Sequence, residues 1–143
     1  MSESLQALAH RRPSVLLVEA EPMLRLTMTK FLRRSGYDVT AWPDADAAAT
    51  ALTQGPRLPS LIVLGVRVLD RETAAVARRL RQAAPDVPML GIADVLHHHG
   101  GDAPDLPDNL RFLAHPFDMP DVLRAVRSSI RRSGFHKALG DPA

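Results

Sequence analysis

Acidic and histidine side chains follow several apolar runs of this sequence, where they could support metal-assisted or group-transfer chemistry. Glu19 and Glu21 come directly after the run SVLLV, Asp94 comes shortly after VPMLGI, and His115 follows LRFLA. Carboxylates are hard ligands for Mg²⁺ and can act as nucleophiles, and a histidine can exchange a proton near neutral pH. Two carboxylates without a third ligand opposite them bind Mg²⁺ weakly. We therefore interpret Glu19 and Glu21 as loop acids, with Glu21 facing His115 or a helix cation as an alternative.

Three further signals are weaker. Asp70 lies five residues after Gly65 and is typical of a helix N-cap. The run His97-His98-His99 cannot point all its imidazoles one way, which favours a solvated loop over a metal site. His115 has no serine, cysteine or aspartate placed as its partner, so we interpret it as a structural residue. The sequence has no cysteine, which excludes disulfides, cysteine-ligated zinc and a thiol nucleophile.

Size and composition indicate one ordinary domain. The 143 residues carry a formal net charge of +2, with a calculated pI of 9.7. The cations are mostly arginines scattered over predicted helices, so solvated helix faces are favoured over a nucleic-acid surface. No apolar run is long enough to span a membrane, and the start does not resemble a signal peptide. We expect a cytoplasmic protein with no membrane partner.

Five apolar runs alternate with helical patterns. The predicted strands are Ser14–Val18, Tyr37–Trp42, Leu61–Leu64 closing on Gly65, Val87–Ile92 and Leu110–Ala114. The predicted helices run from Pro22 to the stop at Ser35-Gly36, from an Asp44 cap to Gly55-Pro56, from Asp70 to Pro85, and from an Asp118 cap over Met119–Arg132. Strands without polar alternation, separated by helices, predict a doubly wound parallel sheet.

One crossover breaks this rhythm. Residues 94–109 contain two glycines and two prolines where a fourth helix should return to the sheet, so that helix is shortened to a turn or missing. The predicted domain spans residues 13–132, between a flexible segment 1–12 and a flexible basic tail 133–143.

Short motifs in consistent order carry a family resemblance. LLVEAEP, RRSGYDV, LIVLG, VPMLGIAD and FLAHPF together resemble the receiver domain of bacterial response regulators, over about residues 13–132. The resemblance implies a flavodoxin-like fold with sheet order 2-1-3-4-5 and a site at the carboxyl ends of the strands.

The resemblance also implies a phosphoryl site whose metal and acceptor positions are altered here. Working receivers hold Mg²⁺ with an acidic pair after the first strand and accept phosphate on an aspartate that ends the third. The pair is Glu19-Ala20 in this chain, with Glu21 kept beside it, and the acceptor position is Gly65. Gly65 lacks a nucleophile and leaves room that neighbours of Met89 or His115 could fill.

The phosphate-binding positions are altered as well. The usual threonine or serine at the end of the fourth strand is Ala93, and the usual lysine is His115. The following Pro116 is kept, and we expect the bond before it to be cis. Phe112 matches the switch aromatic. The nucleophile and its metal and phosphate partners act together, so the loss of all of them removes the activity. The sequence therefore predicts a degenerate receiver, or pseudo-receiver, without aspartyl phosphorylation.

We therefore expect a stand-alone, non-enzymatic signalling protein that needs no cofactor. Its expected partners are a histidine kinase, another regulator or an output protein, with a homodimer as a further possibility; nucleic acid is disfavoured. The tail after Arg132 is too short for an effector domain. Two alternatives stay open: phosphorylation at a relocated acceptor such as Asp94 in a phosphorelay, and a small-ligand or nucleic-acid module.

Overall fold

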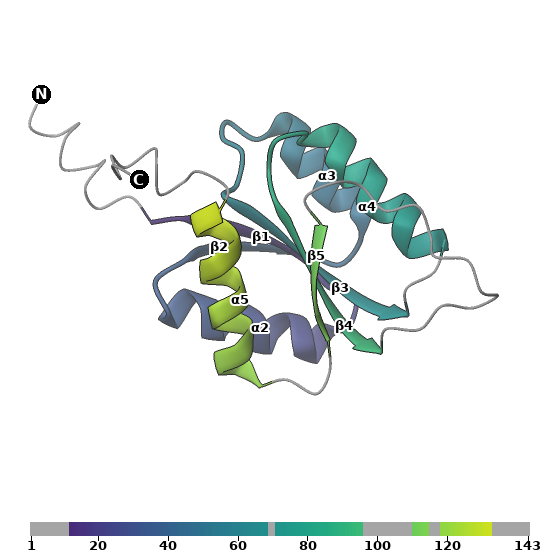
Figure 1. The fold of residues 1–143 in the computed structure, drawn as a ribbon. Helices are drawn as coiled ribbons and strands as arrows, with labels where there is room; N and C mark the ends of the chain where they lie inside the picture. Colours follow the sequence, from purple (N-terminus) through teal and green to yellow (C-terminus); the bar gives the residue numbers. More distant parts are fainter. Residues whose placement is uncertain (1–11, 69–70, 96–109, 115–117, 133–143) are drawn as a thin grey trace, which may run out of the picture.

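The computed structural model describes residues 12–68, 71–95, 110–114 and 118–132, which form five strands and four helices (Figure 1). In chain order the elements are β1 (Ser14–Val18), α2 (Pro22–Arg34), β2 (Asp38–Trp42), α3 (Ala45–Gln54), β3 (Leu61–Val68), α4 (Arg71–Ala83), β4 (Met89–Val95), β5 (Leu110–Ala114) and α5 (Met119–Arg132). None of the helices in these ranges is both long enough and apolar enough to cross a bilayer.

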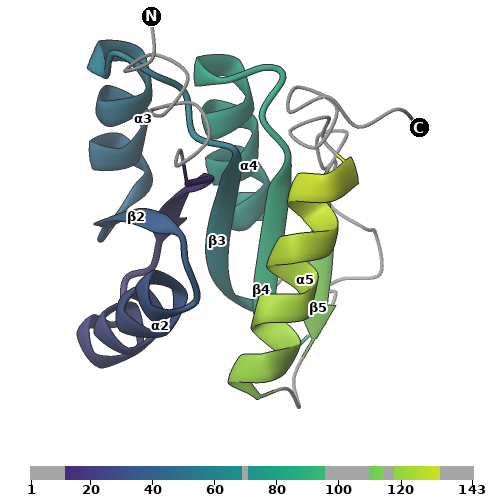
Figure 2. The same ribbon diagram turned by 90° about the vertical axis from the view of Figure 1, so that its left-hand side faces the viewer.

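The strands form one parallel sheet in the order β2-β1-β3-β4-β5, as predicted. Helices α2 and α5 cover one face and α3 and α4 cover the other, so the sheet lies between two helical layers (Figure 2). Alternate residues of β3 enter opposite cores because side chains alternate along a strand: Leu61 and Val63 pack toward α2 and α5, and Ile62, Leu64 and Val66 pack toward α3 and α4. The predicted fold class is confirmed.

Helix α2 begins and ends at residues whose backbone roles explain its bounds. Pro22 opens the helix, where a missing N–H leaves no bond unmade, and Glu21 is the N-cap. Ser35 is the C-cap and Gly36 follows with a φ of 103°, a left-handed conformation that favours glycine. Asp44 likewise caps α3 by accepting the Ala47 N–H at 2.8 Å.

Helix α5 begins with a reciprocal pair of aspartates. The Asp121 N–H donates to the Asp118 carboxylate at 2.9 Å, and the Asp118 N–H donates back to Asp121 at 2.9 Å. Arg124, one turn further along, pairs with Asp121. The bond from the Asp118 N–H, with the help of Arg124, lowers the pKa of the Asp121 carboxyl. The predicted cap at Asp118 is confirmed.

Strands β3 and β4 run further than the sequence predicted. We expected β3 to close on Gly65, but it continues to Val68 with Gly65 paired to Ile92, Val66 to Ala93 and Val68 to Val95. The β-branched residues after Gly65 explain the difference, because buried Val66 joins the core beneath α3 and α4 and extends the pairing. Gly65 therefore lies inside a paired strand instead of at its end.

Several predicted features lie outside the described residues. They are the terminal segments 1–11 and 133–143, the Asp70 cap, the histidines 97–99 with the rest of the irregular crossover 96–109, and the His115-Pro116 bond.

Candidate functional site

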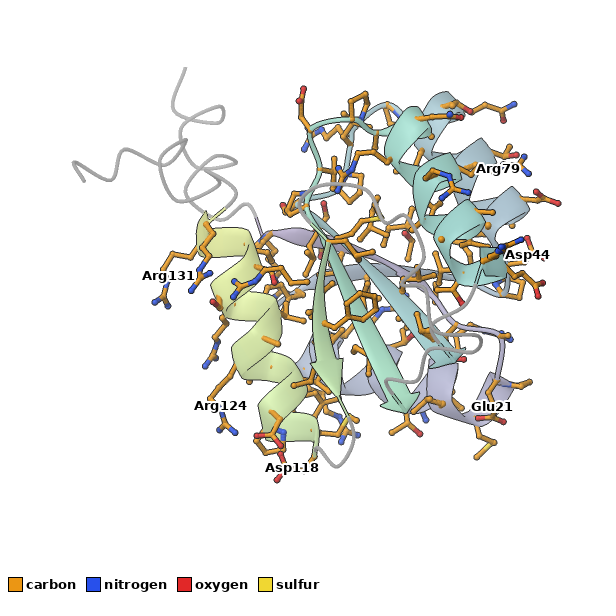
Figure 3. All side chains as sticks on the ribbon, turned by 45° about the vertical axis from the view of Figure 1, so that its right-hand side comes forward. Glu21, Asp44, Arg79, Asp118, Arg124 and Arg131 are labelled. Atoms are coloured by element: carbon orange, nitrogen blue, oxygen red, sulfur yellow. The ribbon has the colours of Figure 1, made fainter. Side chains whose placement is uncertain are left out.

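The loop between β1 and α2 brings its acidic residues to the carboxyl end of the sheet. Val18 pairs with Leu64, so the next residues, Glu19 and Gly65, lie beside each other near this end of the sheet. The Glu19 N–H donates to the Trp42 carbonyl at 3.0 Å, which ties the start of the loop to β2. Glu21 and Asp118 both lie at the end of the molecule where the strand arrows finish (Figure 3).

The Glu19 side chain folds inward over Gly65. A Cβ placed on Gly65 would lie 2.8 Å from the Glu19 Cδ atom and would overlap its Oε1 atom. The other carboxylate oxygen, Oε2, accepts the Glu21 N–H at 2.9 Å, which fixes the inward conformation. The carboxylate of Glu19 therefore occupies the space into which an acceptor side chain at position 65 would project.

This arrangement corrects one of our expectations about Gly65. Met89 belongs to the core beneath α3 and α4, whereas Gly65 follows Leu61 and Val63 on the face of α2 and α5. Met89 thus lies on the wrong side of the sheet to fill the space, and Glu19 fills it. Sequence reasoning missed this contact because 46 residues separate the two positions along the chain.

Glu21 is a helix cap. Its carboxylate accepts the N–H groups of Met23 at 3.2 Å and Leu24 at 2.6 Å, the first-turn donors that a helix leaves unpaired. A glutamate here also complements the positive end of the helix dipole. Glu21 is thus engaged by backbone donors of α2, and the ion pairs found among the described residues do not include it. His115 lies outside the described residues.

Arg25 closes the loop from the helix side. Its Nη1 atom donates to the carbonyl oxygens of Glu19 at 2.8 Å and Ala20 at 3.4 Å. The Thr29 hydroxyl donates to the Arg25 carbonyl at 2.7 Å and is buried one turn below. The loop is consequently held by charge-assisted bonds, and the carbonyl oxygens of Glu19 and Ala20 each accept one from Arg25.

The residues present do not fit the magnesium ion that the receiver resemblance implies. A Mg²⁺ site requires several oxygen ligands in near-octahedral geometry, usually including one or two carboxylates. Ala20 and Gly65 supply no side-chain oxygen, Glu19 accepts the Glu21 N–H, and Glu21 caps α2. Within the described ranges, no group of three or more potential metal ligands is found.

The remaining predicted positions are described in part. Ala93 pairs with Val66, and Asp94 is the next residue inside β4. The strand thus extends past the position where a receiver ends its fourth strand. The side chains of both residues and all of His115 lie outside the described part of the chain.

Phe112 packs over a glycine of the neighbouring strand. Phe112 of β5 is paired with Gly91 of β4, and a Cβ on Gly91 would lie 2.6 Å from the ring atom Cδ1. The half-buried ring also packs against the core beneath α3 and α4. The motif FLAHPF identified Phe112 as the aromatic position. Its partner, Gly91, could have been noticed as the glycine inside the predicted strand of VPMLGIAD.

Comparisons with known proteins agree with this fold. The chain is 27% identical over 129 residues to the probable transcriptional regulatory protein TcrX of Mycobacterium tuberculosis, over 85% of this chain and 51% of that protein. It is 25% identical over 119 residues to the response regulator receiver protein CpdR of Brucella abortus, over 81% of this chain and 95% of that protein. The chain thus spans about half the length of one of these relatives and nearly all of the other.

Solved structures give the same result. A response regulator receiver protein from Sinorhizobium medicae superimposes with a TM-score of 0.64 at 23% identity, covering 86% of this chain and 98% of that one. No protein-family model matches the sequence. CpdR and the solved structure from Sinorhizobium medicae are response regulator receiver proteins, and this chain has the receiver fold.

Proposed function

We propose that this chain is a receiver-type module of two-component signalling that acts by protein–protein interaction and accepts no phosphoryl group on aspartate. The observation that carries the proposal is the Glu19 carboxylate folded over Gly65. The chain keeps the receiver fold, and the space of the acceptor side chain is filled by a residue of the first loop.

The chemistry explains why this change matters. Forming an acyl phosphate needs a carboxylate nucleophile in line with the donor, and a metal ion to offset charge on the transferred oxygens. Gly65 removes the nucleophile and Ala20 removes an oxygen ligand of the metal. Groups that act as a unit fail together, so the remaining carboxylates Glu19 and Glu21 do not restore part of the activity. On this proposal the protein is not an enzyme and needs no cofactor.

The packing of Phe112 favours a single output state. A ring held over Gly91 and against the α3–α4 core has little freedom to change rotamer without opening a cavity between β4 and β5. We infer that the surface formed by β5 and α5 keeps one arrangement, and that binding of a partner replaces phosphate as the input.

The partner on this proposal is another signalling protein: a histidine kinase, a second regulator or an output protein in the cytoplasm. Helix α5 presents Arg124, Arg127, Arg131 and Arg132, all exposed, beside β5. This charge suits an acidic protein surface and would steer its approach. The same charge opposes pairing of α5 with α5 in a second copy, so a homodimer would have to use another face.

A direct test uses beryllofluoride, which mimics a phosphoryl group on an aspartate. Amide spectra of the ¹⁵N-labelled chain are recorded with Mg²⁺, before and after adding beryllofluoride. The proposal expects no change at Gly65, Gly91 or Phe112. A phosphorylatable receiver treated in parallel shows that the reagent is active. Saturable shifts clustered at these residues would overturn the proposal.

A further inference from the structure

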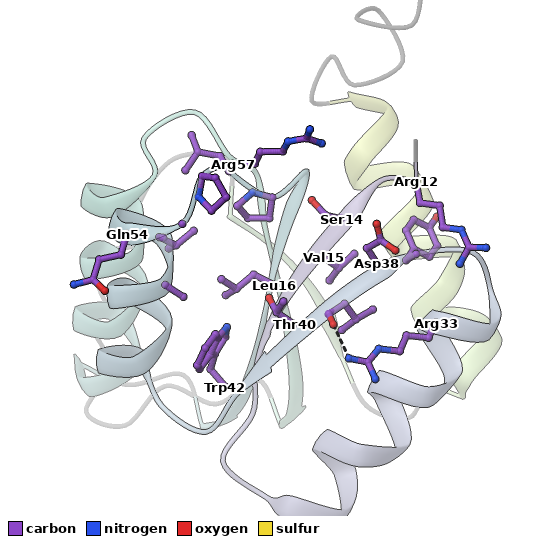
Figure 4. A pocket seen from close by; sticks show the side chains of 18 residues that line it. Arg12, Ser14, Val15, Leu16, Arg33, Asp38, Thr40, Trp42, Gln54 and Arg57 are labelled. Carbon is purple, nitrogen blue, oxygen red and sulfur yellow. Dashed lines mark hydrogen bonds between the residues drawn. The ribbon is translucent and has the colours of Figure 1, made fainter. Parts of the chain in front are cut away.

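A hollow separates helix α3 from the edge of the sheet formed by β1 and β2 (Figure 4). Its volume is about 800 Å³, within the range of pockets that bind small molecules. It is lined by Leu16 and Thr40 of the strands, by Leu52 of α3, by Trp42 and by residues 55–59.

Helix α3 covers the edge strand β2 incompletely. This helix is rich in alanine, and it packs more extensively against α4 than against β2. Thr40 is consequently exposed and Trp42 is only half-buried, although both project toward the α3 side of the sheet. Leu58 at the rim keeps 52% of its surface exposed, so apolar area stays uncovered beside the hollow.

Trp42 supplies a hydrogen-bond donor without an acceptor. Its indole nitrogen Nε1 is buried, and no described residue accepts a bond from it. Figure 4 shows the nitrogen edge of the indole turned toward the space between β2 and α3. A buried N–H group normally has a partner, so this one favours a ligand that carries an oxygen acceptor.

The charges around the hollow favour an anion. The lining contains Arg12, Arg33 and Arg57 against Asp38, so three cations and one anion give a formal charge of +2. Arg33 donates to the Val39 carbonyl at 2.9 Å, the dashed line in Figure 4, which leaves Arg12 and Arg57 as the cations at the rim. The described ion pairs lie elsewhere, between Arg79 and Asp46 and between Arg124 and Asp121.

We propose that this hollow binds a small organic anion with an apolar body. The body packs on the Trp42 ring and the exposed Leu58 side chain, the negative group lies toward Arg57 and Arg12, and an oxygen atom of the ligand accepts the Trp42 N–H. The proposal does not rest on the proposed signalling function, because it uses no side chain of the Glu19–Gly65 site, although the Trp42 main-chain carbonyl accepts the Glu19 N–H.

Trp42 makes the proposal directly measurable, because it is the single tryptophan of the sequence. The probe is 8-anilinonaphthalene-1-sulfonate, an aromatic anion that accepts energy from an excited indole. The full chain should show saturable quenching of the tryptophan with matching sulfonate emission, at one site per chain. N-phenyl-1-naphthylamine has the same rings without the sulfonate and should bind roughly fivefold more weakly, the size expected for partly exposed charge pairs.

Matched variants separate this site from general surface binding. Arg57→Glu should weaken sulfonate binding at least fivefold and leave the neutral probe unchanged, whereas Arg127→Ala on the distant helix α5 should alter neither. Ala51→Phe places a ring in the hollow and should lower energy transfer from Trp42 to both probes, with its melting temperature checking that it folds. Energy transfer that is absent, is not saturable, or is lowered equally by Arg57→Glu and Arg127→Ala would overturn the proposal. Arg57→Glu is an exposed surface change and decides the question if Ala51→Phe fails to fold.

Discussion

The Glu19 carboxylate lies directly over Gly65, where a Cβ atom would meet its Cδ at 2.8 Å. Its Oε2 atom accepts the Glu21 N–H at 2.9 Å, so the inward conformation is bonded as well as sterically allowed. The two residues come from the first loop and the third strand, and their contact depends on the absence of a side chain at position 65. The pair therefore couples the conformation of the first loop to the absence of a side chain at position 65.

Gly65→Ala should destabilise the fold by about 1–2 kcal/mol, because the new methyl group displaces the Glu19 carboxylate and breaks its bond to Glu21. Glu19→Ala removes the obstacle, so the double variant should be more stable than the sum of the single effects predicts. Urea unfolding of the four proteins measures the coupling. Gly36→Ala is the control, since its cost comes from a φ of 103° and should add independently to Glu19→Ala. Additive effects at Gly65 and Glu19 would contradict the account.

Gly91→Ala should cost about 1–3 kcal/mol, because a methyl group there collides with the Phe112 ring. Phe112→Leu shortens the obstructing side chain, and Gly91→Ala made in that background should cost clearly less. Thermal unfolding of the single and double variants checks the result. An equal cost in both backgrounds would mean that Phe112 does not hold its ring over Gly91.

Millimolar Mg²⁺ should leave the melting temperature of the unmodified chain unchanged, because its remaining loop carboxylates are engaged by backbone N–H groups. The variant Ala20→Asp with Gly65→Asp restores two oxygen ligands and should become Mg²⁺-sensitive, gaining ~1.4 kcal/mol at ten times its Kd. The same variant in Ca²⁺-free and Mg²⁺-free buffer is the baseline. Stabilisation of the unmodified chain by Mg²⁺ would show that a metal site persists.

The Asp118–Asp121 pair should make the start of α5 sensitive to acid. The Asp118 N–H and Arg124 lower the pKa of Asp121 in the folded state. A depressed folded pKa contributes stability above the unfolded value of about 3.9, and that contribution is lost as the pH falls through the folded pKa. The urea midpoint of the unmodified chain should therefore fall between about pH 5 and about pH 3, and Asp121→Asn should make this fall smaller. Asp86→Asn, an exposed change in the turn before β4, should reduce the fall less.

The fold and its caps could be predicted from sequence because their causes are local. Apolar runs fix the strands. Asp44 and Asp118 mark helix starts through bonds to residues three positions along, and Pro22 marks one because its missing N–H leaves no bond unmade. The predicted end of β3 was wrong, because Gly65 was interpreted as the last residue of the strand, whereas Val66 beyond it pairs with Ala93. The β-branched residues after Gly65 were the available local signal, and the burial of Val66 against the core could be seen only in the assembled sheet.

The contacts within the site were not predictable for a different reason. The Glu19–Gly65 and Gly91–Phe112 contacts join residues on different elements, and they exist only once the sheet has assembled. The motifs did single out Gly65 and Phe112, and both residues take part in these contacts. The Trp42 hollow depends on how α3 packs against α4 and the sheet, which local sequence patterns do not predict.

The central claim is that this receiver fold accepts no phosphoryl group on aspartate. Its most direct test is the intact mass of the full chain after incubation with Mg²⁺ and acetyl phosphate, with a phosphorylatable receiver in parallel. The account predicts an unchanged mass for this chain and an adduct on the control. A phosphoryl adduct that disappears in Asp94→Asn, or in another single aspartate variant, would contradict it and establish the relocated acceptor instead.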